Sequence, residues 1–275
     1  MTPVVKPRMW AVPNLETSSG CFETMRAYHG KIFRLSQHMG RLYASAAYLG
    51  VVIPMAPDAM ARRLTKALDE SGIREAVVRV ALIPVSSRGG TRVAEPSLVV
   101  VPVQMPTAAQ YRTGIRVAVV PTKRFPVGQI DPQSKFSARL GSIMAVMDAQ
   151  LRGVDEALFE DAMGYVTEST ASNLGIIKDG VFLASPCWLG LLAGITWQAL
   201  VEVAHALQIP VKEVPLTRHD LYNADEAFLS STIKEVLPVT VIDGRAIGTG
   251  RPGPHADRLR RGFARLVKRE LRVRG

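Results

Sequence analysis

The hydrophobic residues of the N-terminal half recur first with a helical and then with a strand-like period. Met39, Leu42 and Ala46 lie on one face of a helical segment, which Gly50 ends. Runs rich in valine follow and are typical of strands. We expect a hairpin turning at 29–30, helices at 36–50 and 56–72, and strands at 76–85, 97–103 and 114–122. This alternation of helices and strands predicts an α/β unit, which we assign to residues 1–120.

The C-terminal half contains more short strands than helices. A polar stretch with Pro and Gly at 121–128 is interpreted as a linker between two domains. After it we expect helices at 136–153, 199–208 and from 256 onward, and strands at 156–161, 165–169, 174–180, 181–185, 210–216, 226–232 and 239–244. The sequence therefore predicts a two-domain protein of the α/β (α+β) class, with a small N-terminal α/β domain and a larger β-rich C-terminal domain over 129–275.

The composition is that of an ordinary globular protein. The chain has 275 residues, of which 47% are hydrophobic. No apolar run reaches the ~20 residues that a membrane-spanning helix needs, so we expect no membrane association. The first residues lack the apolar core of a secretory signal, and two cysteines are too few for a disulfide framework or a zinc site. These features favour a reducing cytoplasm and predict no metal.

Positive charge is concentrated at the C-terminus. The net charge is +10, and residues 256–275 hold eight Arg or Lys against two acids, a net +6. Leu259, Phe263 and Leu266 recur there with near-helical spacing, which predicts an amphipathic helix with a basic outer face. A solvated helix face explains this pattern better than nucleic-acid or membrane binding, so a nucleic-acid partner is not expected.

Five features could carry chemistry, although each has an ordinary structural explanation. Lys135 precedes a helix, Glu168 lies among hydroxyl residues, and Arg41 lies on the first helix. The turns at 194–196 and 230–235 combine glycine or hydroxyl residues with backbone N–H groups. A lysine can form a Schiff base with an aldehyde, and a carboxylate can keep a pyridine nitrogen protonated. N–H-rich turns and an arginine can bind a phosphate. Together these are the parts of a pyridoxal 5′-phosphate site.

The order of these motifs resembles that of the class IV (fold-type IV) pyridoxal-phosphate enzymes. This family includes branched-chain aminotransferases, D-amino-acid aminotransferases and aminodeoxychorismate lyases. The resemblance runs from about residue 20 to about 260, and the segment GVDEALFEDAMGYVTESTASNLGIIKDG is its most specific part. It implies that Lys135 is the catalytic Schiff-base lysine and Glu168 the acid beside the pyridine nitrogen. The other cofactor contacts implied are Arg41, Ile195, Thr196 and Thr232, with Thr232 and Ile233 also binding the substrate carboxylate.

The same resemblance implies a reaction and an assembly. Lys135 would move a proton between the substrate and the cofactor. An amino acid and a 2-oxo acid would exchange an amino group, and two copies would form a homodimer with the sites near its interface. We therefore expect a pyridoxal-phosphate-dependent aminotransferase, with branched-chain amino acids as the first expected substrates.

The residues around the substrate depart from the common family pattern. Thr17 lies where family members commonly have a tyrosine. Ala138 and Arg139 lie three and four residues after Lys135, where many members have an asparagine. Trp197 follows the GIT turn, where an arginine is usual. The strand at 76–85 also lacks a Tyr-Ile-Arg pattern. These departures leave two alternatives: a lyase that releases pyruvate from aminodeoxychorismate, and a paralogue that binds the cofactor without turnover.

Overall fold

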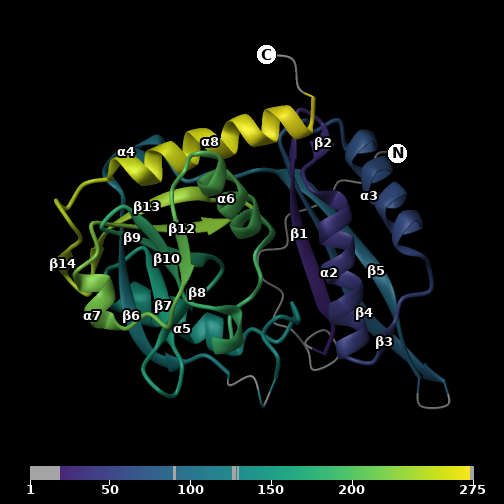
Figure 1. The fold of residues 1–275 in the computed structure, drawn as a ribbon. Coiled ribbons are helices and arrows are strands. Elements are labelled where there is room, and N and C mark those ends of the chain that lie inside the picture. The colour runs from purple at the N-terminus through teal and green to yellow at the C-terminus, as the bar shows by residue number, and fades with distance from the viewer. Residues whose placement is uncertain (1–18, 89–90, 126–127, 129, 273–275) are drawn as a thin grey trace.

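The computed structural model describes residues 19–88, 91–125, 128 and 130–272. Its strands form two sheets, one of five strands and one of nine (Figure 1). The first sheet contains β1 (Cys21–Tyr28), β2 (Lys31–Ile32), β3 (Val51–Val52), β4 (Ala76–Arg88) and β5 (Thr91–Pro102). The second contains β6 (Ile115–Lys123), β7 (Glu156–Glu160), β8 (Val166–Ser169), β9 (Asn173–Lys178), β10 (Val181–Ala184), β11 (Val211–Glu213), β12 (Glu226–Ser231), β13 (Glu235–Ile242) and β14 (Arg245–Ala246).

Two amphipathic helices cover one face of the five-stranded sheet. They are α2 (Leu35–Tyr48) and α3 (Pro57–Ser71), and their buried residues form a core with β1 and β4. Met39, Leu42 and Ala46 are all buried in this core, as the sequence predicts. The strands follow the order β2-β1-β4-β5-β3, so the hairpin of β1 and β2 is continued by antiparallel β4 and β5. This arrangement holds one face of β1 against helices.

The nine-stranded sheet curls back on itself. Eight of its strands follow the order β11-β10-β9-β12-β13-β6-β7-β8, and the ninth, β14, pairs with β13. Strand β8 also pairs with β9, which closes a ring of strands around an apolar core. The helices α6 (Ile195–Ala206) and α8 (Pro254–Glu270) pack together against the outside of this ring, and α5 (Leu140–Leu151) packs against β6 and β7. Three short helices complete the large unit: α4 (Ala108–Thr113), η1 (Cys187–Leu189) and α7 (Arg218–Tyr222).

Strand β6 belongs to the second sheet and not to the first. It pairs in parallel with β13 and β7, although the sequence analysis placed most of it in the N-terminal unit. A valine-rich strand carries no signal for the sheet that it joins, because its long-range partners decide this. We therefore propose a domain boundary before α4, in the segment 103–107, in place of 121–128.

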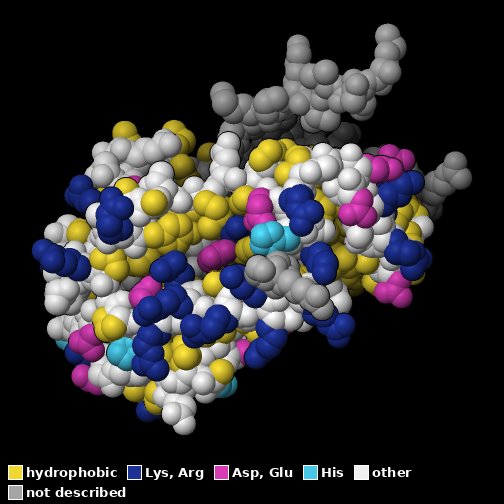
Figure 2. Space-filling view, turned by 90° about the horizontal axis from the view of Figure 1, so that it is seen from above, with side chains coloured by type: hydrophobic (Ala, Val, Ile, Leu, Met, Phe, Trp, Pro, Cys, Tyr) yellow, Lys and Arg dark blue, Asp and Glu magenta, His cyan; other side chains and the backbone are white. Residues whose placement is uncertain are grey.

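The last helix has the amphipathic character expected from the sequence. Leu259, Phe263 and Leu266 are buried against the rest of the large unit. Figure 2 is seen from above this helix and shows Lys and Arg side chains gathered over its outer face. Among the described residues, no helix is long and apolar enough to cross a membrane.

Candidate functional site

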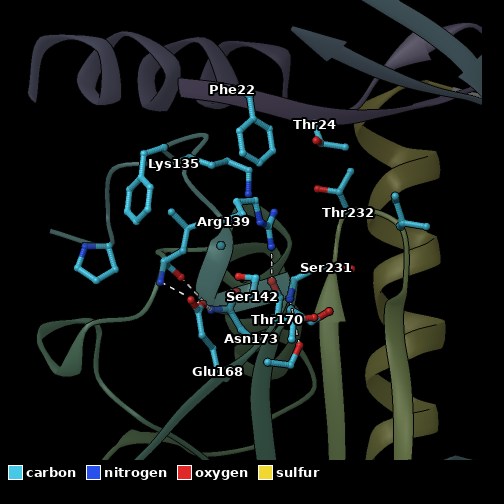
Figure 3. A pocket seen from close by; sticks show the side chains of 18 of the residues that line it. Phe22, Thr24, Lys135, Arg139, Ser142, Glu168, Thr170, Asn173, Ser231 and Thr232 are labelled. Atoms are coloured by element: carbon cyan, nitrogen blue, oxygen red, sulfur yellow. Dashed lines mark hydrogen bonds between the residues drawn. The ribbon is translucent and has the colours of Figure 1, made fainter. Parts of the chain in front are cut away.

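A cavity of about 530 Å³ lies where the two units meet. Its lining comes from β1, β4 and β5 on one side and from the large unit on the other (Figure 3). All seven residues singled out from the sequence line it: Arg41, Lys135, Glu168, Ile195, Thr196, Thr232 and Ile233. The structure thus brings five separate segments of the chain to one place.

Lys135 lies in the loop before α5, and its backbone is held on both sides. Its carbonyl oxygen accepts a hydrogen bond from the N–H of Phe22 at 3.0 Å, and its own N–H donates to Ser45 Oγ at 3.0 Å. The Nζ atom lies 5.0 Å from the centroid of the Phe22 ring. Burial and the nearby charge of Arg41 lower the pKa of Lys135 to about 7. A neutral amine is therefore available near neutral pH.

Glu168 is fixed by three donors. It lies on β8 and is 6% exposed. Its Oε1 is 2.6 Å from an Nη atom of Arg124. Its Oε2 accepts from the backbone N–H of Leu192 at 3.1 Å and from the Asn173 amide at 3.4 Å. This carboxylate is oriented in the cavity wall before any ligand binds.

Arg41 is paired with a carboxylate that is fully buried. Its Nε and one Nη bind the two oxygens of Glu23 at 2.6 and 2.9 Å, and its other Nη donates to the carbonyl oxygen of Ala193 at 2.8 Å. His38 Nδ1 lies 2.8 Å from Glu23. Burial raises the pKa of Glu23, but the hydrogen bond with His38 and the charge of Arg41 outweigh it and lower the pKa to about 2. Arg41 is thereby held at the edge of the cavity and tied to the turn before α6.

The start of α6 presents backbone N–H groups to the cavity. Gly194 is its N-cap residue, and no side chain caps this end. The first N–H groups of a helix lack internal acceptors and carry partial positive charge. A Cβ atom at position 194 would lie 2.0 Å from Asn173 Oδ1, so glycine is needed for this close approach. Ile195 and Thr196 follow directly and line the cavity.

The turn that carries Thr232 and Ile233 connects β12 and β13 and is held by both units. Glu235 at its end has φ 53° and accepts hydrogen bonds from Arg26 at 2.7 Å and from Tyr28 at 2.9 Å. Both donors lie on β1 of the small unit. A positive φ in a non-glycine residue is uncommon and persists where its surroundings enforce it. The turn is therefore fixed relative to the opposite wall of the cavity.

Three arginines of this cavity were not predicted as functional residues from the sequence: Arg79, Arg124 and Arg139. Arg124 binds Glu168, whereas Arg79 and Arg139 have no carboxylate partner among the described residues. The Cζ atoms of Arg79 and Arg139 lie 4.3 and 5.7 Å from the centroid of the Phe22 ring. Arg139 was visible only as a departure from the family pattern, and a single arginine on a strand, such as Arg79, is ordinary by itself.

Two further departures from the family pattern are Trp197 and Thr17. Trp197 is buried and packs edge-on against Phe182, with ring centroids 4.8 Å apart. It belongs to the core beneath α6 and not to the lining of the cavity. Thr17 lies outside the described residues.

The cavity lining is strongly positive. Glu168 is its only acidic member within the described part of the chain. The cationic members are Arg41, Arg79, Lys123, Arg124, Lys135, Arg139 and Lys234. The described residues contain no group of three or more His, Cys, Asp or Glu that could hold a metal ion. The arrangement suits an anionic ligand that also meets an amine and a carboxylate.

Comparison with known proteins gives consistent matches along the chain. The family model "Amino-transferase class IV" matches residues 20–242. A putative branched-chain-amino-acid aminotransferase of Methanocaldococcus jannaschii is 36% identical over 251 residues, which cover 89% of this chain and 85% of the relative. A D-alanine aminotransferase of Listeria monocytogenes is 34% identical over 260 residues, covering 91% of this chain and 87% of the relative.

Solved structures agree with these matches. A branched-chain amino acid aminotransferase from T.th. with pyridoxamine 5′-phosphate has a TM-score of 0.87 and 33% identity, and the match covers 92% of this chain and 86% of that one. The branched-chain amino acid aminotransferase of Escherichia coli also has a TM-score of 0.87, at 27% identity, with 92% of this chain and 89% of that one covered.

Proposed function

The chain belongs to the class IV aminotransferase family, and we propose on this basis that it moves an amino group between an amino acid and a 2-oxo acid with pyridoxal 5′-phosphate as its cofactor. The observation that carries the proposal is that Lys135 and Glu168, 33 residues apart in the sequence, line one cavity. An amine with a pKa lowered to about 7 and an oriented carboxylate are the two groups that this chemistry needs.

The residues of the cavity fit this cofactor. The start of α6 has no side-chain cap, so its first backbone N–H groups remain available as donors to a phosphate. Ser230 Oγ lines the cavity, is buried, and has no hydrogen-bond partner among the described residues. We assign the phosphate to Arg41, Ile195, Thr196 and Thr232, the pyridine nitrogen to Glu168, and the aldehyde to Lys135.

In this proposal the cofactor and the residues of the chain have separate roles in the reaction. When bound, pyridoxal phosphate supplies an electron sink that stabilises the negative charge left on the substrate Cα after its proton departs. Glu168 would hold the pyridine nitrogen in its protonated form, and the ion pair with Arg124 at 2.6 Å keeps that carboxylate in place. Lys135 takes the proton from Cα and delivers it again, which requires the neutral amine that its environment favours.

The turn between β12 and β13 binds the substrate carboxylate in this proposal. Thr232 and Ile233 line the same cavity as the apolar ring of Phe22, and backbone N–H groups of a turn can bind a carboxylate. The contacts of Glu235 to Arg26 and Tyr28 keep this turn in position, so that the substrate is oriented without reorganisation.

We assign branched-chain aliphatic amino acids as the first substrate class. Several relatives and solved neighbours carry this name, and Val77, Val99 and Val101 give the cavity an apolar side that suits an aliphatic side chain. Other relatives are named D-alanine aminotransferases, so both enantiomers of each amino acid belong in the assay.

A homodimer is the proposed assembly. Helix α5 exposes a stripe of large apolar side chains at helical spacing: Leu140, Met144, Met147 and Leu151 are all more than half exposed in the single chain. Such a patch on one helix is typical of a surface that a partner covers. The cytoplasm is the proposed location, because the free thiols of Cys21 and Cys187 suit a reducing compartment.

The test is steady-state transfer from leucine, valine and alanine of either hand to pyruvate and 2-oxoglutarate, with both products quantified. We expect one hand of at least one aliphatic amino acid to react, and no reaction with Lys135→Ala. Formation of 4-aminobenzoate from aminodeoxychorismate without any amino transfer would instead identify a lyase. Cofactor binding without either reaction would identify a non-catalytic paralogue.

A further inference from the structure

Lys234 lies in the turn between β12 and β13, directly after the two residues assigned to the substrate carboxylate. Its backbone is held on both sides: its N–H donates to Ser231 Oγ at 3.1 Å, and its carbonyl oxygen accepts from the Tyr111 hydroxyl at 2.9 Å. Its side chain forms an ion pair with Glu156 on β7, and its Nζ donates to Ser172 Oγ at 3.2 Å. One lysine thus connects this turn to three other segments of the large unit.

The carboxylate that binds Lys234 is itself fixed in a buried network. The side chains of Lys234 and Glu156 are 21% and 10% exposed. The other carboxylate oxygen of Glu156 accepts a hydrogen bond from the hydroxyl of Thr170. Thr170 and Ser172 both line the cavity (Figure 3), whereas Glu156 is not part of its lining as far as the chain is described. Water screens an ion pair in this position less than a surface pair, so it can hold the geometry of the turn.

A second, smaller cavity of about 220 Å³ lies against the same turn. Ile233 and Lys234 line both cavities, and neither residue is fully buried. Glu156 also lines the smaller cavity. A segment between two hollows has few neighbours that fix it by close packing, so its polar contacts determine where it lies.

The turn is held from two directions through consecutive residues of opposite charge. Glu235 binds Arg26 of the small unit at 2.7 Å, and Lys234 binds Glu156 of the large unit. The first ion pair fixes the turn relative to the opposite wall of the cavity. The second fixes it relative to the loop that follows Glu168. Movement of the turn in either direction therefore strains one of the two ion pairs.

We propose that Lys234 is a positioning residue, which keeps the turn of Thr232 and Ile233 in place for the α-carboxylate and does not bind the substrate itself. This inference rests on the proposed function, in which that turn takes the carboxylate. A turn that is ordered before the substrate arrives loses less conformational entropy on binding. Both substrates carry an α-carboxylate, so Lys234 affects the amino acid and the 2-oxo acid alike, whatever their side chains.

Comparison of an acid with its amide isolates the contribution of the carboxylate. Dissociation constants of 4-methylpentanoate and 4-methylpentanamide are measured by calorimetry with pyridoxal phosphate in excess. We expect Lys234→Met to weaken binding of the acid about fivefold to thirtyfold, because its hydrogen bonds are loosened and not removed, and to change binding of the amide less than about threefold.

Lys123→Met is the matched control for the loss of charge. Lys123 lines the same cavity and is paired with buried Glu160, but it lies on β6 and not on the turn. This variant removes one positive charge from the lining and leaves the contacts of Lys234 intact. We expect it to change binding of the acid less than about threefold. A loss as large as that in Lys234→Met would show that the net charge of the cavity matters and would contradict positioning.

Glu156→Gln breaks the same ion pair from outside the cavity and separates positioning from direct binding. If Lys234 positions the turn, Glu156→Gln weakens binding of the acid about as much as Lys234→Met, and the double variant weakens it no further. If Lys234 binds the carboxylate itself, the freed charge strengthens binding of the acid, and the proposal is wrong. Lys234→Met leaves buried Glu156 unpaired, which lowers the melting temperature. The double variant regains stability and keeps the weak acid binding, whereas a merely structural role would restore both.

Reaction kinetics separate this inference from the proposed function. With leucine of the accepted hand, the two single variants raise KM several-fold and change kcat less than about threefold. Equal losses for acid and amide, or unchanged binding of the acid in every variant, contradict the role of Lys234 and leave the proposed function standing. If the unmodified protein transfers no amino group, the proposed function fails. The acid and amide measurements then still decide whether Lys234 controls the binding of a carboxylate at this turn.

Discussion

Lys135 shows how one side chain acquires a reactive state from its surroundings. Its backbone is tied to β1 and α2, and its amine lies over Phe22 among arginines. Burial and Arg41 lower its pKa to about 7, whereas a lysine in water titrates at about 10.4. The sequence could identify Lys135 only through its place among other motifs, because the origin of the shift lies in residues distant along the chain.

The capture of pyridoxal phosphate by the cofactor-free protein should therefore depend on pH with a midpoint near 7. The neutral amine is the nucleophile, so the initial rate rises as pH increases through the pKa of Lys135 and levels off above it. Stopped-flow absorbance from pH 5.5 to 9 measures this rate. A rate that keeps rising to pH 9 would show that the amine has an ordinary pKa, and Lys135→Ala serves as the blank.

Glu168 should affect chemistry more than binding. Glu168→Gln keeps the shape and the hydrogen bonds from Leu192 and Asn173 but removes the charge that stabilises a protonated pyridine. We expect kcat to fall about a hundredfold or more, in the range of a lost general acid–base or electrostatic contribution, with cofactor still bound. Steady-state kinetics and the visible absorbance of the same preparation check both parts. Loss of the cofactor with a normal kcat for the loaded fraction would assign Glu168 to binding instead.

Segments that are amphipathic or rich in valine could be predicted closely. The first two helices, the hairpin of β1 and β2 and the final helix α8 lie where their hydrophobic pattern indicates, because local periodicity and burial agree there. The short elements α4, α7, η1 and β3 were not predicted, since two to six residues carry too little periodicity. The pairing of β6 with β7 and β13 could not be predicted either, because contacts between residues distant in the sequence decide which strands pair.

The turn between β12 and β13 is held by hydrogen bonds from the opposite unit, which Arg26 and Tyr28 donate to Glu235. In Glu235→Gln the hydrogen bonds can persist while the charge beside buried Arg26 is lost, and we expect a loss of about 1–3 kcal/mol of interaction free energy. The turn then moves more freely, so KM for the amino acid rises several-fold while cofactor capture stays close to normal. A steady-state assay together with an equilibrium titration of the cofactor measures the two effects. Unchanged KM would mean that Arg26 and Tyr28 do not position this turn.

At the scale of the molecule, two cores of different architecture meet at the cavity. The two units also contact each other away from the cavity. Arg34 forms ion pairs with Glu202 and Glu270, and the ring centroids of Phe33 and Phe263 lie 5.6 Å apart. The buried face of α8 is part of the core of the large unit. The sequence could predict two units and the residues that line the cavity between them. It could not predict on which side of the cavity each of these residues lies.

The stripe on α5 should control assembly. Met144→Glu combined with Met147→Glu places two charges in the surface that the proposed homodimer buries, and desolvating them opposes association. Sedimentation equilibrium should give a dimer for the unmodified chain and a monomer for the double variant. Gln150→Glu lies on the same helix outside the stripe and is the control. A monomeric unmodified chain, or a dimer that resists both substitutions, would remove α5 from the interface.

The most direct test of the account is an absorbance spectrum of the purified protein with pyridoxal phosphate, recorded before and after single L- and D-amino acids are added. We expect a visible band that depends on Lys135 and that bleaches with one hand of at least one aliphatic amino acid. A band that persists with every amino acid would contradict amino transfer. The absence of any band in the presence of excess cofactor would contradict the assignment of the cavity itself.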